Sequence, residues 1–208
     1  MSGESIDLGY LLDKAASSHG HLCAGIPMGV RMGIAGLREL DMIDPSKRRD
    51  LIVLAEIDRC ITDAISVTTG CTVGKRSLKL VNYGKFAATF VNTSSGKAVR
   101  VVSRNDARDS AIRFAERSGW TTPGERLPEF SHREKEILIK GYMEMPEAEL
   151  IFIERVKVSL PSEELPGAPT HIVFCKSCGE SIFDHKEVVK GGGIFCTSCA
   201  NGAYYDRT

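Results

Sequence analysis

The sequence lacks any apolar run that approaches the roughly 20 residues of a membrane-spanning helix. Its first residues, MSGESIDLGYLLDK, have neither the basic nor the apolar stretch of a secretory signal peptide. An excess of positive charge is also missing, because 27 lysines and arginines balance 27 aspartates and glutamates. Nonspecific nucleic-acid binders need such an excess. These absences predict a cytoplasmic protein without a membrane partner and argue against nucleic-acid binding.

Disulfide bonds are not expected either. Seven cysteines in a chain without an export signal indicate a reducing compartment, where thiols bind metals or take part in catalysis. Four of them lie between residues 175 and 199, and the other three are Cys23, Cys60 and Cys71. The cysteines are therefore the first candidates for functional sites.

Apolar periodicity predicts an α+β domain over residues 1–160. Helices are predicted over 5–18, 26–40, 58–69, 106–117 and 132–142, and strands over 51–57, 78–82, 86–92, 97–103 and 150–158. The turn TSSG at 93–96 joins two of these strands in a hairpin, which excludes a purely parallel sheet. We therefore expect a mixed β-sheet core with packed helices, plus a small zinc-finger domain.

Local signals refine the helices. Asn105 is placed to cap the helix that follows it, and Ser131 with Glu134 forms a capping box for the next one. Glycine recurs at every fourth position of the second helix, at Gly25, Gly29 and Gly33. Because glycine costs about 1 kcal/mol in a helix interior, this repeat predicts that another backbone packs very close.

The carboxy-terminal part reads as a separate metal-binding module. Residues 159–170 hold three prolines and two glutamates, and we place a linker at 161–170 and a second domain at 171–208. CKSC and CTSC give this domain the spacing of a zinc site with the ligands Cys175, Cys178, Cys196 and Cys199. Four thiolates complete a tetrahedron around one zinc ion. A helix over 197–205 would make the arrangement treble-clef-like.

The zinc in this module is expected to be structural. Nearly forty residues with few large apolar side chains do not fold readily without a metal. His185 lies between the two cysteine pairs and is expected at the surface, because four thiolates already fill the site. Acidic residues match the lysines and arginine of the module, so a protein contact is the next choice after a folding role, ahead of nucleic acid.

A second group of candidate ligands lies in the large domain. His19, His21 and Cys23 alternate along HGHLC, so an extended backbone would direct all three to one side. Imidazole and thiolate are preferred ligands of transition metals such as zinc and nickel. Cys23 and Cys60 each lie near the start of a predicted helix, where the helix dipole favours a thiolate. These residues predict a second transition metal, zinc or nickel, in the core.

Neighbouring residues leave alternatives open. Cys71 is either a further ligand or an ordinary buried thiol. Asp58 and Asp63 flank Cys60 and either orient a ligating histidine or transfer protons, or they are exposed residues of the same helix. If the site is catalytic, Cys60 and Cys23 are the candidate catalytic residues.

Four stretches resemble the family of the formylmethanofuran dehydrogenase E subunit, in the family's order: HGHLCAGIPMGVRMG (19–33), DRCITDAISVTTGCTVGK (58–75), NYGKFAATF (82–90) and GKAVRVV (96–102). The finger resembles one carried by some members. The resemblance implies an α+β core, usually dimeric and related in topology to a dehydrogenase catalytic domain, with a metal-capable cleft. The site residues that it implies are His19, His21, Cys23, Cys60 and Cys71.

Three functions follow from these observations. The first is a metal-binding subunit or accessory protein of molybdenum- or tungsten-dependent one-carbon metabolism of the methanogenesis type, with partner subunits of that enzyme and a homodimer as the expected assembly. The second is a stand-alone enzyme that uses a bound metal or a Cys60 nucleophile. The third is an interaction protein whose zinc finger recruits a partner.

Overall fold

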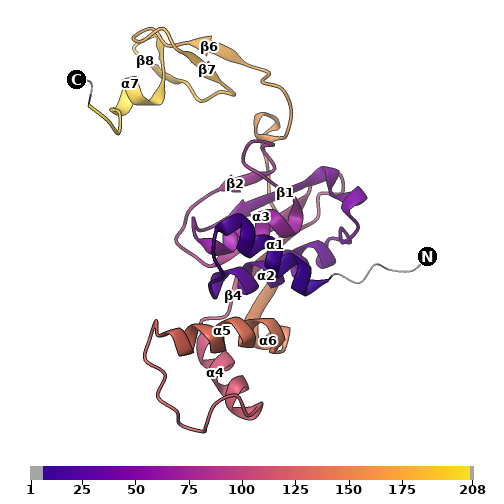
Figure 1. The fold of residues 1–208 in the computed structure, drawn as a ribbon. Coiled ribbons are helices and arrows are strands. Elements are labelled where there is room, and N and C mark those ends of the chain that lie inside the picture. The colour runs from indigo at the N-terminus through magenta and orange to yellow at the C-terminus, as the bar shows by residue number, and fades with distance from the viewer. Residues whose placement is uncertain (1–6, 207–208) are drawn as a thin grey trace. The chain divides into compact units, whose positions relative to one another are not determined.

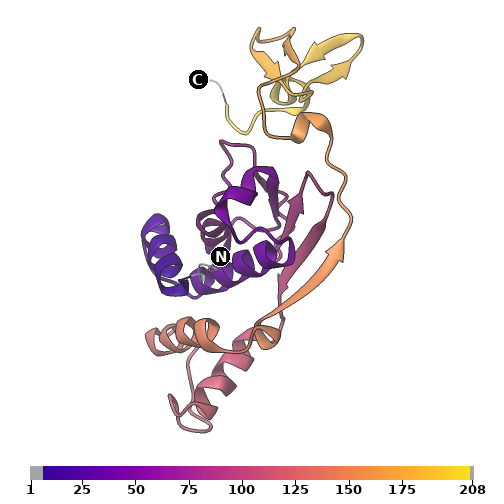
Figure 2. The same ribbon diagram turned by 90° about the vertical axis from the view of Figure 1, so that its right-hand side faces the viewer.

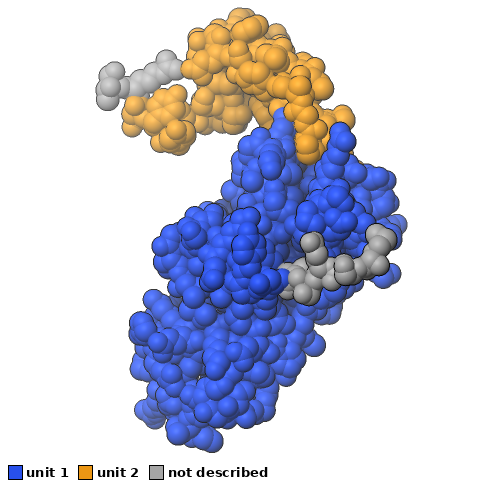
Figure 3. All heavy atoms as spheres, turned by 45° about the vertical axis from the view of Figure 1, so that its right-hand side comes forward, with its two compact units in different colours: residues 1–158 blue, residues 159–208 orange. Residues whose placement is uncertain are grey.

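The computed structural model describes residues 7–206, which divide into two compact units, one ending at Val158 and one beginning at Ser159 (Figure 3). The second unit therefore begins before the predicted linker. Among residues 7–206, no helix is long and apolar enough to cross a membrane.

A five-stranded mixed sheet forms the centre of the first unit. Its strands run in the order β2-β1-β3-β4-β5, and only the β1–β2 pair is parallel. Their bounds are β1 Leu51–Ala55, β2 Leu78–Leu80, β3 Ala87–Asn92, β4 Ala98–Ser103 and β5 Ile151–Val156. The register places Val53 opposite Phe90 and Phe90 opposite Val99, so these three buried side chains line one face. The predicted α+β class is confirmed.

Two helices cover this apolar face, and a third packs on their outer side. The two are α2 Gly25–Glu39 and α3 Cys60–Thr69, the third is α1 Leu8–His19, and Figures 1 and 2 show all three on one side of the sheet. Met32 of α2 and Ile65 of α3 belong to the same buried cluster as Val53 and Phe90. A smaller cluster around Ala15 joins α1 to the outer side of α2 and α3. The short 3-10 helix η1, Pro45–Asp50, leads from this layer into β1.

The glycine repeat of α2 is where α3 approaches. A Cβ atom added at Gly29 would lie 2.5 Å from the Ile61 carbonyl oxygen, and one added at Gly33 would lie 2.8 Å from Thr68. A Cβ at Gly25 would lie 3.0 Å from the Cβ of Cys60. Successive glycines of α2 thus meet residues of α3 that come successively later in the sequence. The two helices therefore run parallel, with their N-termini side by side. This confirms the close backbone approach that the repeat predicts.

Between β4 and β5 the chain forms a helical insertion, with α4 Ala107–Arg117, α5 His132–Glu144 and α6 Glu147–Leu150. Ser131 caps α5 as predicted, and its hydroxyl accepts a 3.1 Å hydrogen bond from the Glu134 N–H. The Glu134 carboxylate accepts from the Phe130 N–H, one residue earlier than in a standard capping box. The prediction for Asn105 is wrong, because Asp106 is the residue before α4 and its carboxylate binds Arg104 instead of the helix.

The second unit consists of two hairpins and a short helix. Its elements are η2 Ser162–Glu164, β6 Ile172–Phe174, β7 Ser181–Phe183, β8 Val188–Lys190, β9 Gly193–Phe195 and α7 Thr197–Asn201. Strand β6 pairs with β7 and β8 with β9, both antiparallel. Helix α7 ends at Asn201 and not at 205, because Gly202 leaves the helical conformation with φ 98°.

We expect Gly29→Ala to lower the free energy of unfolding by about 1–3 kcal/mol, because the new methyl group has no room against the Ile61 backbone. Urea denaturation followed by circular dichroism measures this loss. Gly9→Ala is the matched control: Gly9 is an exposed helical glycine whose added Cβ would meet only Asp7, at 3.4 Å. That change should stabilise the protein by about 0.4–1 kcal/mol. Equal effects at the two positions would contradict the close approach.

Candidate functional site

The four cysteines of the second unit converge on one point. Their sulfur atoms all lie within 4.8 Å of one another, and those of Cys178 and Cys196 are 3.9 Å apart. Cys175 and Cys178 occupy the turn between β6 and β7, which closes at Gly179 with φ 76°. Cys196 precedes α7 and Cys199 lies within it. Short turns thus bring together two pairs of thiols in the arrangement that suits a tetrahedral zinc ion.

The backbone of this group favours ionised sulfur. N–H groups of Cys178 and Cys196 donate to the Cys175 sulfur and lower the pKa of that thiol to about 6. A thiolate is the form that binds zinc, so the donors prepare the site for the metal. The residues present therefore fit a four-cysteine zinc centre.

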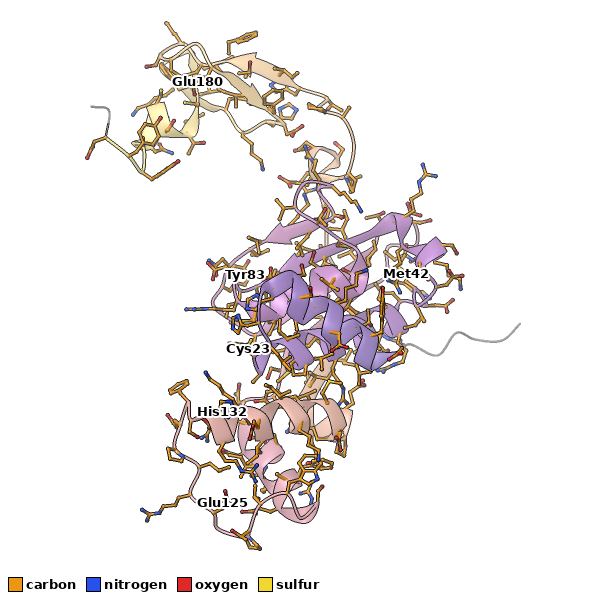
Figure 4. The ribbon with its side chains drawn as sticks, viewed as in Figure 1. Cys23, Met42, Tyr83, Glu125, His132 and Glu180 are labelled. Atoms are coloured by element: carbon orange, nitrogen blue, oxygen red, sulfur yellow. The ribbon has the colours of Figure 1, made fainter. Side chains whose placement is uncertain are left out.

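A second convergence lies at the start of α2 and α3 in the first unit. A ring nitrogen of His19 and the thiols of Cys23 and Cys60 all lie within 4.8 Å of one another. His19 is the last residue of α1, and Cys23 lies in the loop that leads into α2 (Figure 4). Cys60 is the first residue of α3. We call these three residues the core cluster.

One ring nitrogen of His19 is held in place and the other has no partner. The Nδ1 atom lies 2.7 Å from the Asp63 Oδ2 atom, at hydrogen-bonding distance. The Nε2 atom is buried and makes no hydrogen bond. Metal-ligating histidines commonly bind a carboxylate through their second nitrogen in this way. Asp63 is thus placed to orient His19, although its own side chain is 56% exposed, whereas Asp58 accepts a hydrogen bond from Asn82 instead.

The Cys60 thiol of the core cluster differs from the Cys175 thiol of the finger. Burial and a hydrogen bond with Cys23 raise the pKa of the Cys60 thiol above its usual value. The helix start was expected to favour a thiolate at Cys60, but desolvation and the second thiol outweigh it. A metal cation would have to displace the Cys60 proton on binding.

Two predicted ligands lie outside the core cluster. His21 is exposed, and its ring centroid is 4.7 Å from that of His19. Gly20 adopts a left-handed conformation with φ 95°, so the extended alternation expected for HGHLC is broken. Cys71 is buried, and its sulfur lies 3.7 Å from the Leu51 carbonyl oxygen beneath the sheet. Its position fits the alternative of an ordinary buried thiol.

An open cavity of 760 Å³ adjoins the core cluster. Ala24 and Gly25 form part of its wall, and Gly25 packs against Cys60. Three cationic side chains also line it: Lys85, Arg104 and Arg108. Sequence reasoning missed the two arginines: Arg104 lies between β4 and α4, and Arg108 lies in the first turn of α4. Nothing in the sequence links these two residues to the distant HGHLC segment.

Comparison with known proteins covers both units. A family model described as "FmdE, Molybdenum formylmethanofuran dehydrogenase operon" matches residues 18–152, which include the whole core cluster. A model described as "Prokaryotic dksA/traR C4-type zinc finger" matches residues 169–205, which include all four cysteines of the second unit. The predicted carboxy-terminal zinc finger is confirmed.

Two individual proteins are similar over nearly the whole chain. A probable S-adenosyl-L-methionine-binding protein of Archaeoglobus fulgidus is 32% identical over 214 residues, which cover 94% of this chain and 53% of that protein. The chain thus spans about half the length of this curated relative. The crystal structure of a tungsten formylmethanofuran dehydrogenase FmdE-like protein from Syntrophus aciditrophicus matches with a TM-score of 0.62 and 23% identity, over 99% of this chain and 100% of that one. That second likeness is one of fold.

We expect the metal affinity of the core cluster to rise with pH and to keep rising above about pH 8.5, where the rise would end for a thiol with its usual pKa. The raised pKa of Cys60 means that its proton must still be displaced at neutral pH. Each displaced proton adds about tenfold in affinity per pH unit. Competition with a chromophoric chelator between about pH 6.5 and 9 measures the slope. Cys60→Ser should lower this slope by one, because one proton fewer is displaced. A flat profile in the unsubstituted protein would mean that these thiols are not the ligands.

Proposed function

Because the chain belongs to the FmdE family of the formylmethanofuran dehydrogenase operon, we propose that it is a metal-binding subunit or accessory protein of molybdenum- or tungsten-dependent one-carbon metabolism, of the methanogenesis type. The family model spans most of the first unit, and the solved protein of similar fold is described as a tungsten formylmethanofuran dehydrogenase FmdE-like protein. Partner subunits of such an enzyme and a homodimer are part of this proposal.

A single observation carries the metal-binding role of the first unit. The buried Nε2 atom of His19 has no hydrogen-bond partner, although a ring nitrogen of that residue lies within 4.8 Å of two thiols. An unpartnered polar atom in a protein interior costs about 1–3 kcal/mol, so a ligand for it is expected. One nitrogen and two sulfurs are a ligand set that zinc and nickel accept.

The protein's own groups would have distinct parts in this site. Asp63 accepts a hydrogen bond from Nδ1 of His19 and so leaves Nε2 as the nitrogen that would bind the metal. Cys23 and Cys60 lose their protons and supply the negative charge. A bound zinc or nickel ion would supply Lewis acidity beside the cavity. Three protein ligands leave a coordination position open for a further ligand.

Metal content tests this proposal. In the full-length protein, His19→Ala and Cys60→Ser should each lower the bound metal by one equivalent, because each removes a ligand of the core cluster, and leave the zinc of the finger in place. Inductively coupled plasma mass spectrometry after purification without chelators measures the content. Cys71→Ala is the matched control, since it removes a buried thiol outside the cluster. The same metal content in all four proteins would disprove a core metal site.

A second candidate function is an enzyme that binds a small substrate with a carboxylate group in the cavity. The observation that favours it is the cavity of 760 Å³ with Lys85, Arg104 and Arg108 in its wall, next to the open coordination position. Arg104 pairs with Asp106, and Arg108 pairs with Glu134. Lys85 lies over the Tyr83 ring, so among these three cations it is the one whose described contact is not with a carboxylate. The relative from Archaeoglobus fulgidus is named for binding S-adenosyl-L-methionine. The carboxylate of that molecule would pair with Lys85, although its sulfonium and ammonium groups make the molecule as a whole cationic.

Isothermal titration of the full-length, metal-loaded protein with S-adenosyl-L-methionine tests the second candidate. Lys85→Ala should weaken binding about tenfold, the effect of losing one charged hydrogen bond of about 1.4 kcal/mol. Lys97→Ala, at an exposed position in the β3–β4 turn, should leave binding unchanged. Absence of binding, or equal weakening by both substitutions, would reject this ligand and leave the metal-binding role standing.

A further inference from the structure

A third group of metal ligands lies in the second unit and shares no residue with the four cysteines. It consists of His171, His185 and Glu187, each of which offers a ligand atom within 4.8 Å of the others. His171 directly precedes β6, whereas His185 and Glu187 lie in the turn between β7 and β8. We call these three residues the hairpin triad. The sequence alone placed His185 at the surface and made no connection with His171.

Backbone contacts hold the two parts of the hairpin triad together. The Asp184 N–H donates to the His171 carbonyl over 2.9 Å, and the Lys186 N–H donates to the Phe183 carbonyl over 3.1 Å. Asp184 and His185 both have left-handed conformations, with φ 56° and 57°. Two such residues in succession cost about 1–2 kcal/mol each, so the surrounding contacts must define this turn closely. The side chain of His185 is thus presented by a fixed backbone.

The side chains converge on the carboxylate of Glu187. Its Oε1 atom lies 3.0 Å from His171 Nε2 and 3.7 Å from His185 Nδ1. The two imidazole rings stack at 3.9 Å between centroids with 10° between their planes. The second carboxylate oxygen, Oε2, is buried and has no hydrogen-bond partner. Lys186, the adjacent cation, pairs with Glu164 and so does not neutralise this carboxylate.

We propose that the hairpin triad is a second metal site of the zinc-finger unit, for a divalent transition metal such as zinc. Two imidazoles and one carboxylate are the protein ligands of many zinc and non-haem iron sites. A cation would satisfy the orphaned Glu187 oxygen, which otherwise costs energy in a buried position. The proposal depends only on these three residues, not on the proposed function of the first unit.

The site would differ from the four-cysteine centre in being open. The side chains of His171 and His185 are 32% and 52% exposed, whereas Glu187 is 15% exposed. Three ligands leave at least one coordination position for water or for a group of a partner molecule. A metal here would also fasten the start of β6 to the β7–β8 turn, because its ligands come from both.

Cobalt titration of the full-length protein distinguishes this site from the other two. Cobalt bound to thiolates shows a sulfur-to-metal charge-transfer band, whereas cobalt bound by imidazole and carboxylate shows only weak visible bands. After the thiolate sites have been filled with zinc, cobalt should add one equivalent without the charge-transfer band. His171→Ala and Glu187→Gln should each weaken this binding at least about tenfold, because each removes a ligand.

Two controls make the result decisive. His132→Ala should leave cobalt binding unchanged, since His132 faces only Glu136, at 3.4 Å, and belongs to no group of three ligands in residues 7–206. Amide NMR spectra of the variants should retain the dispersed signals of the zinc-loaded finger, which excludes unfolding as the cause. No cobalt binding beyond the thiolate sites, or equal binding in folded His171→Ala and unsubstituted protein, would overturn the proposal. Loss of the core metal in the experiments above leaves this outcome unaffected.

Discussion

The close approach of α2 and α3 is the constraint on which the first unit depends. Glycine at positions 25, 29 and 33 removes the side chains that would separate the two backbones, so the helices run parallel with their N-termini adjacent. Cys23 precedes one of these helices and Cys60 begins the other. The packing that closes the apolar core therefore also creates the pair of thiols. An alanine in the repeat would disturb the core and the candidate metal site together.

The two units are stabilised by different interactions. The first unit buries a continuous apolar cluster between its sheet and helices, and its metal ligands lie at the margin of that cluster. In the described part of the second unit, the buried apolar residues are Cys175 and Ile182 alone. So small a core does not offset the conformational entropy of some forty residues, and a metal is needed. Backbone donors that lower the pKa of Cys175 assist that binding.

The core cluster combines features that suit exchange of a ligand better than permanent structural binding. It has three ligands, a Cys60 thiol with a raised pKa, and an adjoining cavity with basic side chains. Asp63 gives the cluster its one fixed element, because it contacts Nδ1 of His19 while Nε2 has no partner. This combination of a fixed histidine and a Cys60 thiol with a raised pKa is the physical basis of the proposed metal-binding role.

Features that depend on neighbours along the chain could be predicted from the residues themselves. The four-cysteine finger, the α5 cap at Ser131 and the strands of the mixed sheet all follow from short-range spacing, because a turn of a few residues leaves little freedom. The glycine repeat also indicated a close backbone contact, though not its partner. Asn105 was misassigned because α4 begins one residue later than predicted, after Asp106.

The meeting of distant side chains, in contrast, depends on how the elements pack. Cys60 joins His19 and Cys23, whereas Cys71 is buried against Leu51 of β1. This difference between two cysteines depends on how the helices pack and not on residue type. His21 was excluded by one left-handed glycine within its own motif. The hairpin triad required two strands to pair before its histidines came together. Side-chain chemistry identified the possible ligands, whereas their convergence required the long-range contacts that the folded chain alone provides.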